Sequence, residues 1–483
     1  MRTFRPRTSL NGRKSLALGI AHSVRQSILR GQLRAGELLP STRQLAEEFG
    51  VHRHTLLSAL ELLVSEGLLL SNPRRGFSVS DSATRLELPA RRDTLVWRGF
   101  RIVRAAALPE VPPVSEITYP LHSATPDPAL VPRAELKVAY AHVLRGRRDE
   151  LFDYPSERGL EPFRRIVGDH LRQHRALVAR EVMVTHGSQE AIALIARALL
   201  APGDVVAVED PGYAPAWHAF RAVGARVVGV PVDEHGLDVE ALEKLLERRR
   251  VRLLYITPSH HFPTAVTLSA ARRAALLGVT AHHGVPILED DYDHEYQYRG
   301  LPLAPLAADR AAQHVIYVGT LSKLVSSGVR LGFVAAQKEL LDALARLCRI
   351  GTRGNDPLSQ AAIAAWMSDG GLERHLRRTR RVYAARRDAL CEALQPAVRD
   401  GLCALRVPDG GLGLWARWLG CDSHRLALAA RNRGILVLPE GGLRLREGSY
   451  EGTRLSFSRC TPERLQAAGA ELIRIARNLA KNG

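Results

Sequence analysis

A lysine and an aspartate are the residues of this chain with the clearest capacity for chemistry. Lys323 ends the segment Gly319-Thr320-Leu321-Ser322-Lys323, and its amine can form a Schiff base with an aldehyde. Asp290 lies in Glu289-Asp290-Asp291-Tyr292, at the expected end of an earlier strand. A buried carboxylate at this place can pair with a pyridinium nitrogen and keep the ring protonated, so that the ring accepts electrons. The two residues together predict a site for pyridoxal phosphate.

Polar and aromatic residues follow other expected strands of the same region. A helix is expected to begin at Ser188, where backbone N–H groups can hold a phosphate, and Tyr213 can stack on a planar ring. Thr320, Ser322 and Arg330 can close around the phosphate, the arginine through two N–H groups. Alone, each residue is explained equally well as a helix cap, a packed ring or a solvated side chain. Their shared position at strand ends favours the cofactor site.

Apolar strands and amphipathic helices alternate through this region, which predicts an α/β fold with a mainly parallel sheet covered on both faces. In such sheets, sites gather at the C-terminal ends of the strands. The clearest helices are expected at 240–248 and 270–281. The strands are expected at 182–185, 205–208, 226–232, 253–257, 286–289, 314–318 and 331–335.

Residues 1–80 have a different pattern, which predicts a DNA-binding unit. An amphipathic helix over 16–30 precedes a short helix that Ser41 caps and Gly50 ends. A second helix follows directly, and a small hairpin is expected over 68–79 with two adjacent arginines in its turn. In such a pair of helices the start of the second enters the major groove of DNA. The alternative is a generic helical cap with solvated arginines.

The charge and the cysteines narrow the class of protein. The net charge is +18, and residues 1–80 hold 12 Lys/Arg against 5 Asp/Glu, a net of +7, so the basic excess is densest there and favours nucleic acid. The five cysteines are scattered without CxxC spacing, which predicts reduced thiols in a cytoplasmic protein, no disulfide and no metal site. No apolar run is long enough to cross a bilayer.

Residues 81–117 are proline-rich and predicted to be a linker between domains at 1–80 and 118–483.

Residues 1–80 resemble the winged helix-turn-helix domain of GntR-type transcription regulators. The resemblance rests on the segment 39–46, from Leu-Pro-Ser-Thr-Arg to Leu-Ala, and on Gly50-Val51, Arg53, Thr55 and Glu66-Gly67. It implies that double-stranded operator DNA is the partner. The residues that would contact DNA are Ser41, Arg43, His52, Arg53, Thr55 and the wing residues Arg74, Arg75 and Gly76.

The larger domain resembles the fold type I aminotransferases, and the whole chain resembles the MocR-type branch of GntR regulators. The carrying motifs include Gly187-Ser-Gln-Glu-Ala191, Glu209-Asp-Pro-Gly-Tyr213, Thr257-Pro-Ser-His-His-Phe-Pro-Thr264 and Gly319-Thr-Leu-Ser-Lys323. The resemblance implies a smaller C-terminal α/β subdomain and a head-to-tail homodimer. The implied cofactor residues are Lys323, Asp290 at the ring nitrogen, Tyr292 at the ring hydroxyl, Tyr213 on the ring, Ser188, Gln189, Thr320, Ser322 and Arg330 at the phosphate, and Tyr154 from a partner subunit.

Family likeness also implies an arginine for the carboxylate of an effector. Arg454 fits this position best, with Arg444 and Arg446 as competitors. The chain departs from the family pattern at His261 and Ala265, where Gln and Gly are more usual, and at Val325-Ser326-Ser327. These departures bear on the shape of the pocket and leave the effector open.

Two functions are consistent with both sets of motifs. The first is a transcription regulator that uses pyridoxal phosphate to sense the cofactor itself or an amino compound, with at most weak or half-reaction transamination. The alternative is an active aminotransferase with an accessory helix-turn-helix. A third hypothesis, a DNA-binding protein with a cofactor-free scaffold, is disfavoured by the nearly complete motif set.

Overall fold

The computed structural model of the protein describes residues 13–29, 31–73, 75–81, 117–146, 148–178, 181–300, 303–309 and 312–481. Its contacts divide the chain into two compact units, with the division between residues 103 and 104. The expected linker, 81–117, lies almost entirely outside the described residues. Among the described helices, none combines the length and apolar character that a membrane crossing requires.

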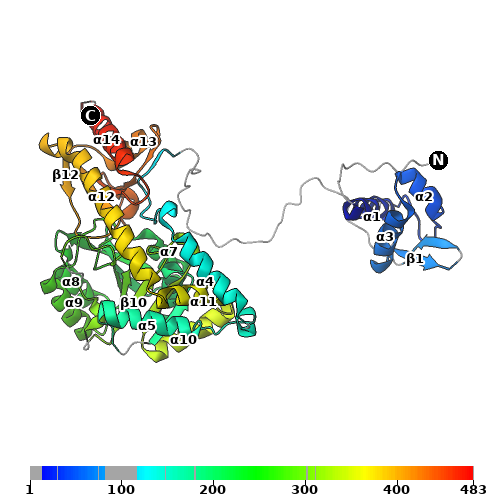
Figure 1. Ribbon diagram of the computed structural model, residues 1–483, viewed down its shortest axis with the longest axis horizontal. Helices are drawn as coiled ribbons and strands as arrows, with labels where there is room; N and C mark the ends of the chain where they lie inside the picture. The colour runs from blue at the N-terminus through cyan, green and yellow to red at the C-terminus, as the bar shows by residue number, and fades with distance from the viewer. Residues whose placement is uncertain are drawn as a thin grey trace. The chain divides into compact units, whose positions relative to one another are not determined.

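The N-terminal unit has three helices followed by an antiparallel hairpin, as the sequence predicts (Figure 1). Ser41 caps the second helix: its hydroxyl accepts a hydrogen bond from the Gln44 N–H, and the Gln44 side chain accepts one from the Ser41 N–H at 3.2 Å. Gly50 ends this helix with φ of 63°. The elements are α1 (Arg13–Leu29), α2 (Thr42–Phe49), α3 (Arg53–Ser65), β1 (Leu69–Asn72) and β2 (Gly76–Val79).

An apolar core of its own holds this unit together. Leu56, Leu60 and Leu63 project from one face of α3 and are fully buried. They pack with Ile20 and Val24 of α1, at the helical spacing that places both sets on facing sides. The buried side of α3 therefore carries the residues that stabilise this unit, and its exposed side does not.

The C-terminal unit is built on an eight-stranded sheet. Strand β11 pairs antiparallel with both of its neighbours and β7 pairs antiparallel with β6, while the other pairings are parallel. The prediction of a mainly parallel sheet is confirmed. The strands, in spatial order, are β4 (Glu181–Thr185), β11 (Gly332–Ala336), β10 (Val315–Thr320), β9 (Ile287–Asp291), β8 (Val251–Ile256), β5 (Val205–Asp210), β6 (Arg226–Asp233) and β7 (Gly236–Leu237).

Helices cover both faces of this sheet, also as predicted (Figure 1). One face packs with α6 (Ser188–Leu199), α7 (Ala214–Ala222) and α10 (Lys338–Gly351). The helices that contribute to the core on the other face are α5 (Glu161–Arg175), α8 (Val239–Arg248), α9 (Ala270–His282) and α11 (Pro357–Ser368), with α4 (Arg133–Arg145) against α11.

The smaller C-terminal α/β subdomain is also present. The long helix α12, yellow in Figure 1, leads from the large sheet region to a four-stranded antiparallel sheet of order β12-β13-β16-β15. Two further helices, α13 and α14, pack on one another and on this part of the chain. The elements are α12 (Gly371–Arg399), β12 (Cys403–Arg406), β13 (Gly413–Trp418), α13 (Ser423–Arg431), β15 (Leu438–Pro439), β16 (Gly452–Ser456) and α14 (Pro462–Lys481), with a short parallel pair β3 (Tyr119–Pro120) and β14 (Ile435–Leu436).

One predicted boundary is wrong in a way that matters for the site. The sequence places the end of a strand at Glu289, but β9 continues to Asp291. Three acids, Glu289, Asp290 and Asp291, therefore lie inside a central strand, and every residue of β9 is buried. The strand tolerates them because each carboxylate has its own partner, so hydrogen bonding offsets the cost of burial.

Candidate functional site

The C-terminal ends of the parallel strands bring the predicted cofactor residues together. Asp290 lies near the end of β9, and Lys323 comes three residues after the end of β10. The two side chains are close enough to change one another's pKa. Tyr213, which follows β5, is near enough to Asp290 and Arg330 for both charges to act on its hydroxyl. Strand ends in neighbouring positions thus converge on one site, as doubly wound sheets require.

Asp290 is a buried acid with one unused oxygen. Its Oδ2 accepts a hydrogen bond of 2.9 Å from the Tyr255 hydroxyl, while Oδ1 is buried with no partner among the described residues. Burial raises the pKa of this carboxyl to about 7, and the charge of Asp291 adds to the rise, against the Tyr255 hydrogen bond and Lys323. A carboxylate with a free, buried oxygen fits a cationic ring nitrogen, which supplies both the charge and the missing hydrogen bond.

The neighbouring acids of β9 are held on the opposite face of the strand. Glu289 accepts backbone N–H bonds from Leu306 at 2.8 Å and Ala307 at 3.0 Å. Asp291 accepts a hydrogen bond of 2.7 Å from the Tyr317 hydroxyl and pairs with Arg175. Burial alone would raise the pKa of Asp291, but Arg175 holds it well below its usual value. Oδ1 of Asp291 also lacks a described partner, but Arg175 compensates the charge of this acid, so Asp290 is the acid of this strand whose charge is left for a ligand.

Lys323 is the amine of the site. Its Nζ donates a hydrogen bond of 3.1 Å to the backbone oxygen of Ala124. Burial and, less strongly, the charge of Arg454 lower the pKa of this ammonium group to about 8, against the opposing charges of Asp293 and Asp290. A larger fraction of neutral amine is available near neutral pH than for an ordinary lysine, and the neutral amine is the nucleophile.

The rate at which pyridoxal phosphate becomes attached should therefore follow the ionisation of Lys323. We expect it to rise about tenfold per pH unit below pH 8 and to level off above it, because the neutral fraction grows until the pKa is passed. Absorption changes after mixing at a series of pH values measure this rate. Asp293→Asn is the control: removal of a negative charge should move the midpoint to lower pH. A midpoint near 10.5, the ordinary lysine value, would contradict the burial of the amine.

A cradle for a phosphate lies at the start of α6. Gly187 precedes the helix with φ of 83°, and a Cβ built on it would lie 3.3 Å from Nη1 of Arg330. Arg330 donates a hydrogen bond of 2.6 Å to the backbone oxygen of His186, so its guanidinium lies beside the N-terminus of the helix that begins at Ser188. Positive charge and free helix N–H groups at one place favour an anion.

Three other residues are predicted to bind the phosphate, namely Ser322, Thr320 and Gln189. The Ser322 hydroxyl is buried with no partner among the described residues, and its N–H donates to the Thr320 hydroxyl at 3.1 Å. Thr320 Oγ1 donates to the Leu331 backbone oxygen at 3.3 Å. Gln189 donates to the Pro215 backbone oxygen at 3.0 Å, and its own Oε1 lacks a described partner. These atoms retain capacity for a ligand.

Two tyrosines predicted for the ring have partners in the protein. The Tyr213 ring meets the edge of Phe262, with centroids 5.2 Å apart and planes at 79°. The Tyr292 hydroxyl donates to the His260 backbone oxygen at 2.9 Å. Burial raises the pKa of both tyrosines, so both remain neutral donors at ordinary pH.

Arg454 is the best placed of the three arginines considered for a carboxylate. It is 1% exposed in β16, donates from Nη1 to the Pro263 backbone oxygen at 2.7 Å, and lies 4.9 Å above the Phe262 ring. Its Nε is buried with no partner among the described residues. Arg444 is instead engaged with Glu440, at 2.8 Å from Nε, and Arg446 is exposed.

The departures from the family pattern have a local cost. Ala265 adopts φ of 57°, a left-handed conformation that glycine adopts freely, so the alanine is strained at this turn. His261 supports the turn: its Nδ1 lies 2.7 Å from the Thr264 hydroxyl and its Nε2 lies 3.1 Å from the Pro211 backbone oxygen. Burial lowers the pKa of His261 to about 3, so the ring is neutral. The turn beside the site is thus held by a histidine.

Tyr154 is separate from the other predicted residues. Its side chain is 73% exposed, and the guanidinium of Arg353 lies 5.3 Å from its ring centroid. It makes no described contact with Lys323 or Asp290. Its role as a residue from a partner subunit stays a prediction.

The predicted DNA-binding residues gather at the starts of two helices. Ser41 and Arg43 lie at the start of α2, where Arg43 is 88% exposed. Arg53 begins α3, is exposed, and donates from Nε to the Thr42 hydroxyl at 3.2 Å. Of the rest, His52 occupies the N-cap position of α3 without a side-chain capping bond and is exposed, and Thr55 is half-buried. Arg75 and Gly76 are exposed in the hairpin, and Arg74 lies outside the described residues.

Sequence reasoning missed several groups that shape the pocket. Tyr255 was only an apolar strand position, yet it holds one oxygen of Asp290. Asp293 pairs with His260 at 2.8 Å, and its negative charge is the largest effect that raises the pKa of Lys323. The motif at 257–264 contains His260, and Asp293 directly follows the segment 289–292, but their pairing across the fold has no signal in local sequence.

Comparison with known proteins identifies both units. Residues 119–472 match the family described as aminotransferase class I and II, and residues 16–79 match the bacterial regulatory proteins of the gntR family. The chain is 31% identical to the HTH-type transcriptional regulator TauR of Rhodobacter capsulatus, over 89% of each chain. It is 30% identical to the HTH-type pyridoxine biosynthesis transcriptional regulator PdxR of Corynebacterium glutamicum, over 82% of each.

Among solved structures, LysN, the α-aminoadipate aminotransferase of Thermus thermophilus, is similar with a TM-score of 0.70 and 29% identity. The match covers 76% of this chain and 94% of LysN, whose structure contains N-(5'-phosphopyridoxyl)-L-leucine. The chain therefore belongs to the aminotransferase class I and II family, and the gntR domain joined to it gives the architecture of the MocR-type transcription regulators.

Proposed function

We propose that this regulator senses pyridoxal phosphate, or an amino compound that reacts with it, and converts that signal into altered binding of operator DNA. The observation that carries the proposal is a buried amine and a buried acid with an unused oxygen, in one chain with an exposed Arg53 at the start of a capped helix pair. A plain enzyme needs no such helix pair, and a plain DNA-binding protein needs no such amine.

Each of the residues that would hold the cofactor would bind a different part of it. Lys323 would bind its aldehyde, Asp290 the ring nitrogen and Arg330 the phosphate, together with the start of α6. When bound, pyridoxal phosphate supplies an electron-accepting ring and a carbonyl that exchanges amines. The unpartnered oxygen of Asp290 and the unpartnered hydroxyl of Ser322 support this assignment.

Arg454 would select the effector. A buried guanidinium with a free Nε favours a carboxylate, which can accept two parallel hydrogen bonds. An amino acid or another amino compound with a carboxylate therefore suits the site, while pyridoxal phosphate alone would leave Arg454 without a ligand. Titration with each kind of compound distinguishes the two effectors.

We further propose the domain boundaries 1–80, 81–117 and 118–483, and a head-to-tail homodimer. The division of contacts between residues 103 and 104, inside the expected linker, supports two separate units. The exposure of Tyr154, at 73%, supports its presentation to a second subunit. Regulation would then follow from a change in dimer geometry that differs between ligand states.

The experiment that tests the function uses the purified full chain and the DNA immediately upstream of its own gene. Binding is measured without ligand, with pyridoxal phosphate, and with amino acids added to the loaded protein. We expect specific binding whose affinity changes with at least one ligand. If the protein does not bind this DNA under any of the three conditions, the proposed role in regulation is wrong. If it binds with an affinity that no ligand changes, the proposed role as a sensor is wrong.

Arg53→Ala should weaken specific DNA binding by about 1–3 kcal/mol, roughly 5- to 150-fold, because an arginine at a recognition helix can bond a guanine edge through two N–H groups. Fluorescence anisotropy with the upstream fragment and a scrambled fragment measures the loss. Arg34→Ala, an exposed arginine of the same unit, is the matched control. An equal loss on both fragments would assign Arg53 to the phosphate backbone instead.

Amino transfer is the second candidate function. The retention of both Lys323 and Asp290 and the likeness to aminotransferase structures favour it. Turnover of an amino donor with a keto acid at about 1–10³ s⁻¹ would make catalysis a principal activity. A single half-reaction without turnover would agree with the sensor.

A further inference from the structure

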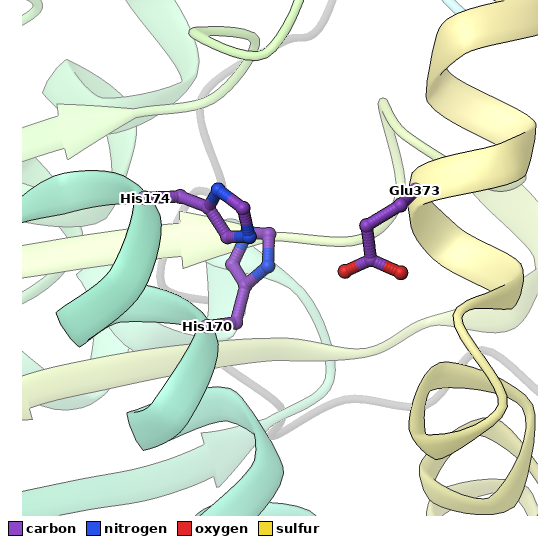
Figure 2. Close-up of side chains that lie close together, drawn as sticks. All are labelled: His170, His174 and Glu373. Carbon is purple, nitrogen blue, oxygen red and sulfur yellow. The ribbon is translucent and has the colours of Figure 1, made fainter.

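Two histidines and a glutamate outside the cofactor site lie within ligand distance of one another. His170 and His174 are one turn apart on α5, and Glu373 faces them from the first turn of α12, as Figure 2 shows. One ligand atom from each of the three lies within 4.8 Å of the others. The elements that carry them are distant in sequence, so the fold itself assembles the cluster.

The hydrogen-bonding capacity of the cluster is largely unused. Nδ1 of His170 is buried with no hydrogen-bond partner among the described residues, and its Nε2 meets Glu295 only at ion-pair distance. Oε2 of Glu373 is also buried with no hydrogen-bond partner in the described part of the chain. Buried polar atoms without partners are rare in folded proteins and need an explanation, such as an ion. His174 is exposed, so the cluster has an opening to solvent.

A second carboxylate lies directly behind His170. Oε1 of Glu295 is 3.5 Å from Nε2 of His170 and 2.9 Å from Nε2 of His294. His170, His294 and Glu295 also satisfy the distance for a ligand set, which shares His170 with the first trio. In metal sites a ligating histidine commonly presents its other ring nitrogen to a carboxylate, and Glu295 is placed for this.

Simple ion pairing accounts for only part of this arrangement. His294 bridges Glu295 and Asp291, and Arg175 completes that chain of charges. That chain does not include His174 or Glu373, and the ring of His174 lies beside the ring of His170, with centroids 4.7 Å apart.

We propose that His170, His174 and Glu373 form a binding site for a zinc-class divalent cation, with water in the remaining position and Glu295 behind His170. Two histidines at positions i and i+4 of a helix point to the same side and suit one ion. Ligand atoms about 2.0–2.2 Å from zinc lie about 3.4 Å apart, so the cluster must close by about 1 Å. The exposed His174 side chain has the freedom to do this.

The chemistry of the ligands selects the class of ion. Imidazole nitrogens suit zinc, nickel, cobalt and copper, whereas magnesium and calcium prefer sites made of oxygen ligands. An ion here would join α5 to α12, beside the segment 290–295 that carries the acid of the cofactor site. This site is additional to the proposed sensor and does not depend on it. The His-x-x-x-His spacing was its only signal in the sequence.

Metal-depleted full-length protein, dialysed against buffered zinc and assayed by elemental analysis, tests the site. We expect about one zinc per chain in the wild type and no displacement by millimolar magnesium. Loss of an outer-shell partner alone costs about 10- to 100-fold in metal affinity, so His174→Ala and Glu373→Gln should each weaken binding at least about 100-fold. His424→Ala, an exposed histidine outside the cluster, should bind as the wild type does.

Thermal unfolding supplies a readout independent of stoichiometry. Zinc should raise the Tm of the wild type and of His424→Ala but not that of His174→Ala, because a ligand stabilises only the fold that binds it. His174 is exposed, so its removal should leave the metal-free Tm unchanged. Absence of zinc from the wild type, or equal zinc affinity in His174→Ala and Glu373→Gln, overturns the proposal.

Discussion

Lys323→Ala should abolish covalent attachment of pyridoxal phosphate. The variant mixed with the cofactor should show no absorption band from lysine-bound cofactor, and borohydride should add no cofactor mass to the chain. The reason is that Nζ of Lys323 is the amine whose pKa burial lowers to about 8 and which lies beside Asp290. Phosphate contacts at Arg330 remain, so reversible binding of the cofactor should persist at lower affinity.

The matched control is Lys338→Ala, which removes an exposed lysine that pairs with Asp342 on α10. It should attach the cofactor as the wild type does. If the wild type shows no band and gains no mass, the C-terminal unit is a scaffold without cofactor, although the DNA-binding prediction would survive. If Lys323→Ala still gains the mass, another amine performs the attachment.

Asp290→Asn should weaken the binding of pyridoxal phosphate by about 2–5 kcal/mol, about 30-fold or more, because removal of one member of a buried charge pair leaves the other uncompensated. The asparagine keeps the shape of the side chain and its oxygen for the Tyr255 hydroxyl. It removes a buried charge, so the free protein should be no less stable. Titration followed by absorption gives the affinity, and thermal unfolding gives the stability.

Tyr255→Phe separates the charge of Asp290 from its hydrogen bond. This change removes only the donor to Oδ2 and should weaken cofactor binding by about 1 kcal/mol, much less than Asp290→Asn. If the two substitutions have equal effects, Asp290 serves to position neighbouring groups, and its charge is not what the ring requires.

Local signals made the N-terminal unit easy to predict. Ser41, Gln44 and Gly50 are cap residues whose chemistry acts within one helix, so the sequence alone places α2 and the turn after it. The hairpin was equally local. The strands of the C-terminal unit were predicted to within a few residues, because continuous apolar runs are typical of parallel strands buried on both faces.

The missed features depend on contacts between distant segments. The extension of β9 to Asp291 could not be predicted, because acids rarely lie inside a buried strand unless partners such as Arg175 and Tyr317 meet them. The same applies to Tyr255, whose hydroxyl reaches a neighbouring strand. The spacing of apolar residues along a strand or helix indicates which face is buried. It does not indicate which polar side chains of distant segments will contact one another on that face.

The three consecutive acids of β9 also bear on how the sheet finds a single pairing. Side chains alternate across a strand, so a slip of one residue would carry Asp290 to the side of Arg175 and turn Glu289 and Asp291 away from their partners. A buried carboxylate without its partner costs several kcal/mol, a penalty that a uniformly apolar strand would not impose. The acids therefore discriminate against misregistered sheets, and folding fidelity and ligand chemistry are encoded in the same short segment.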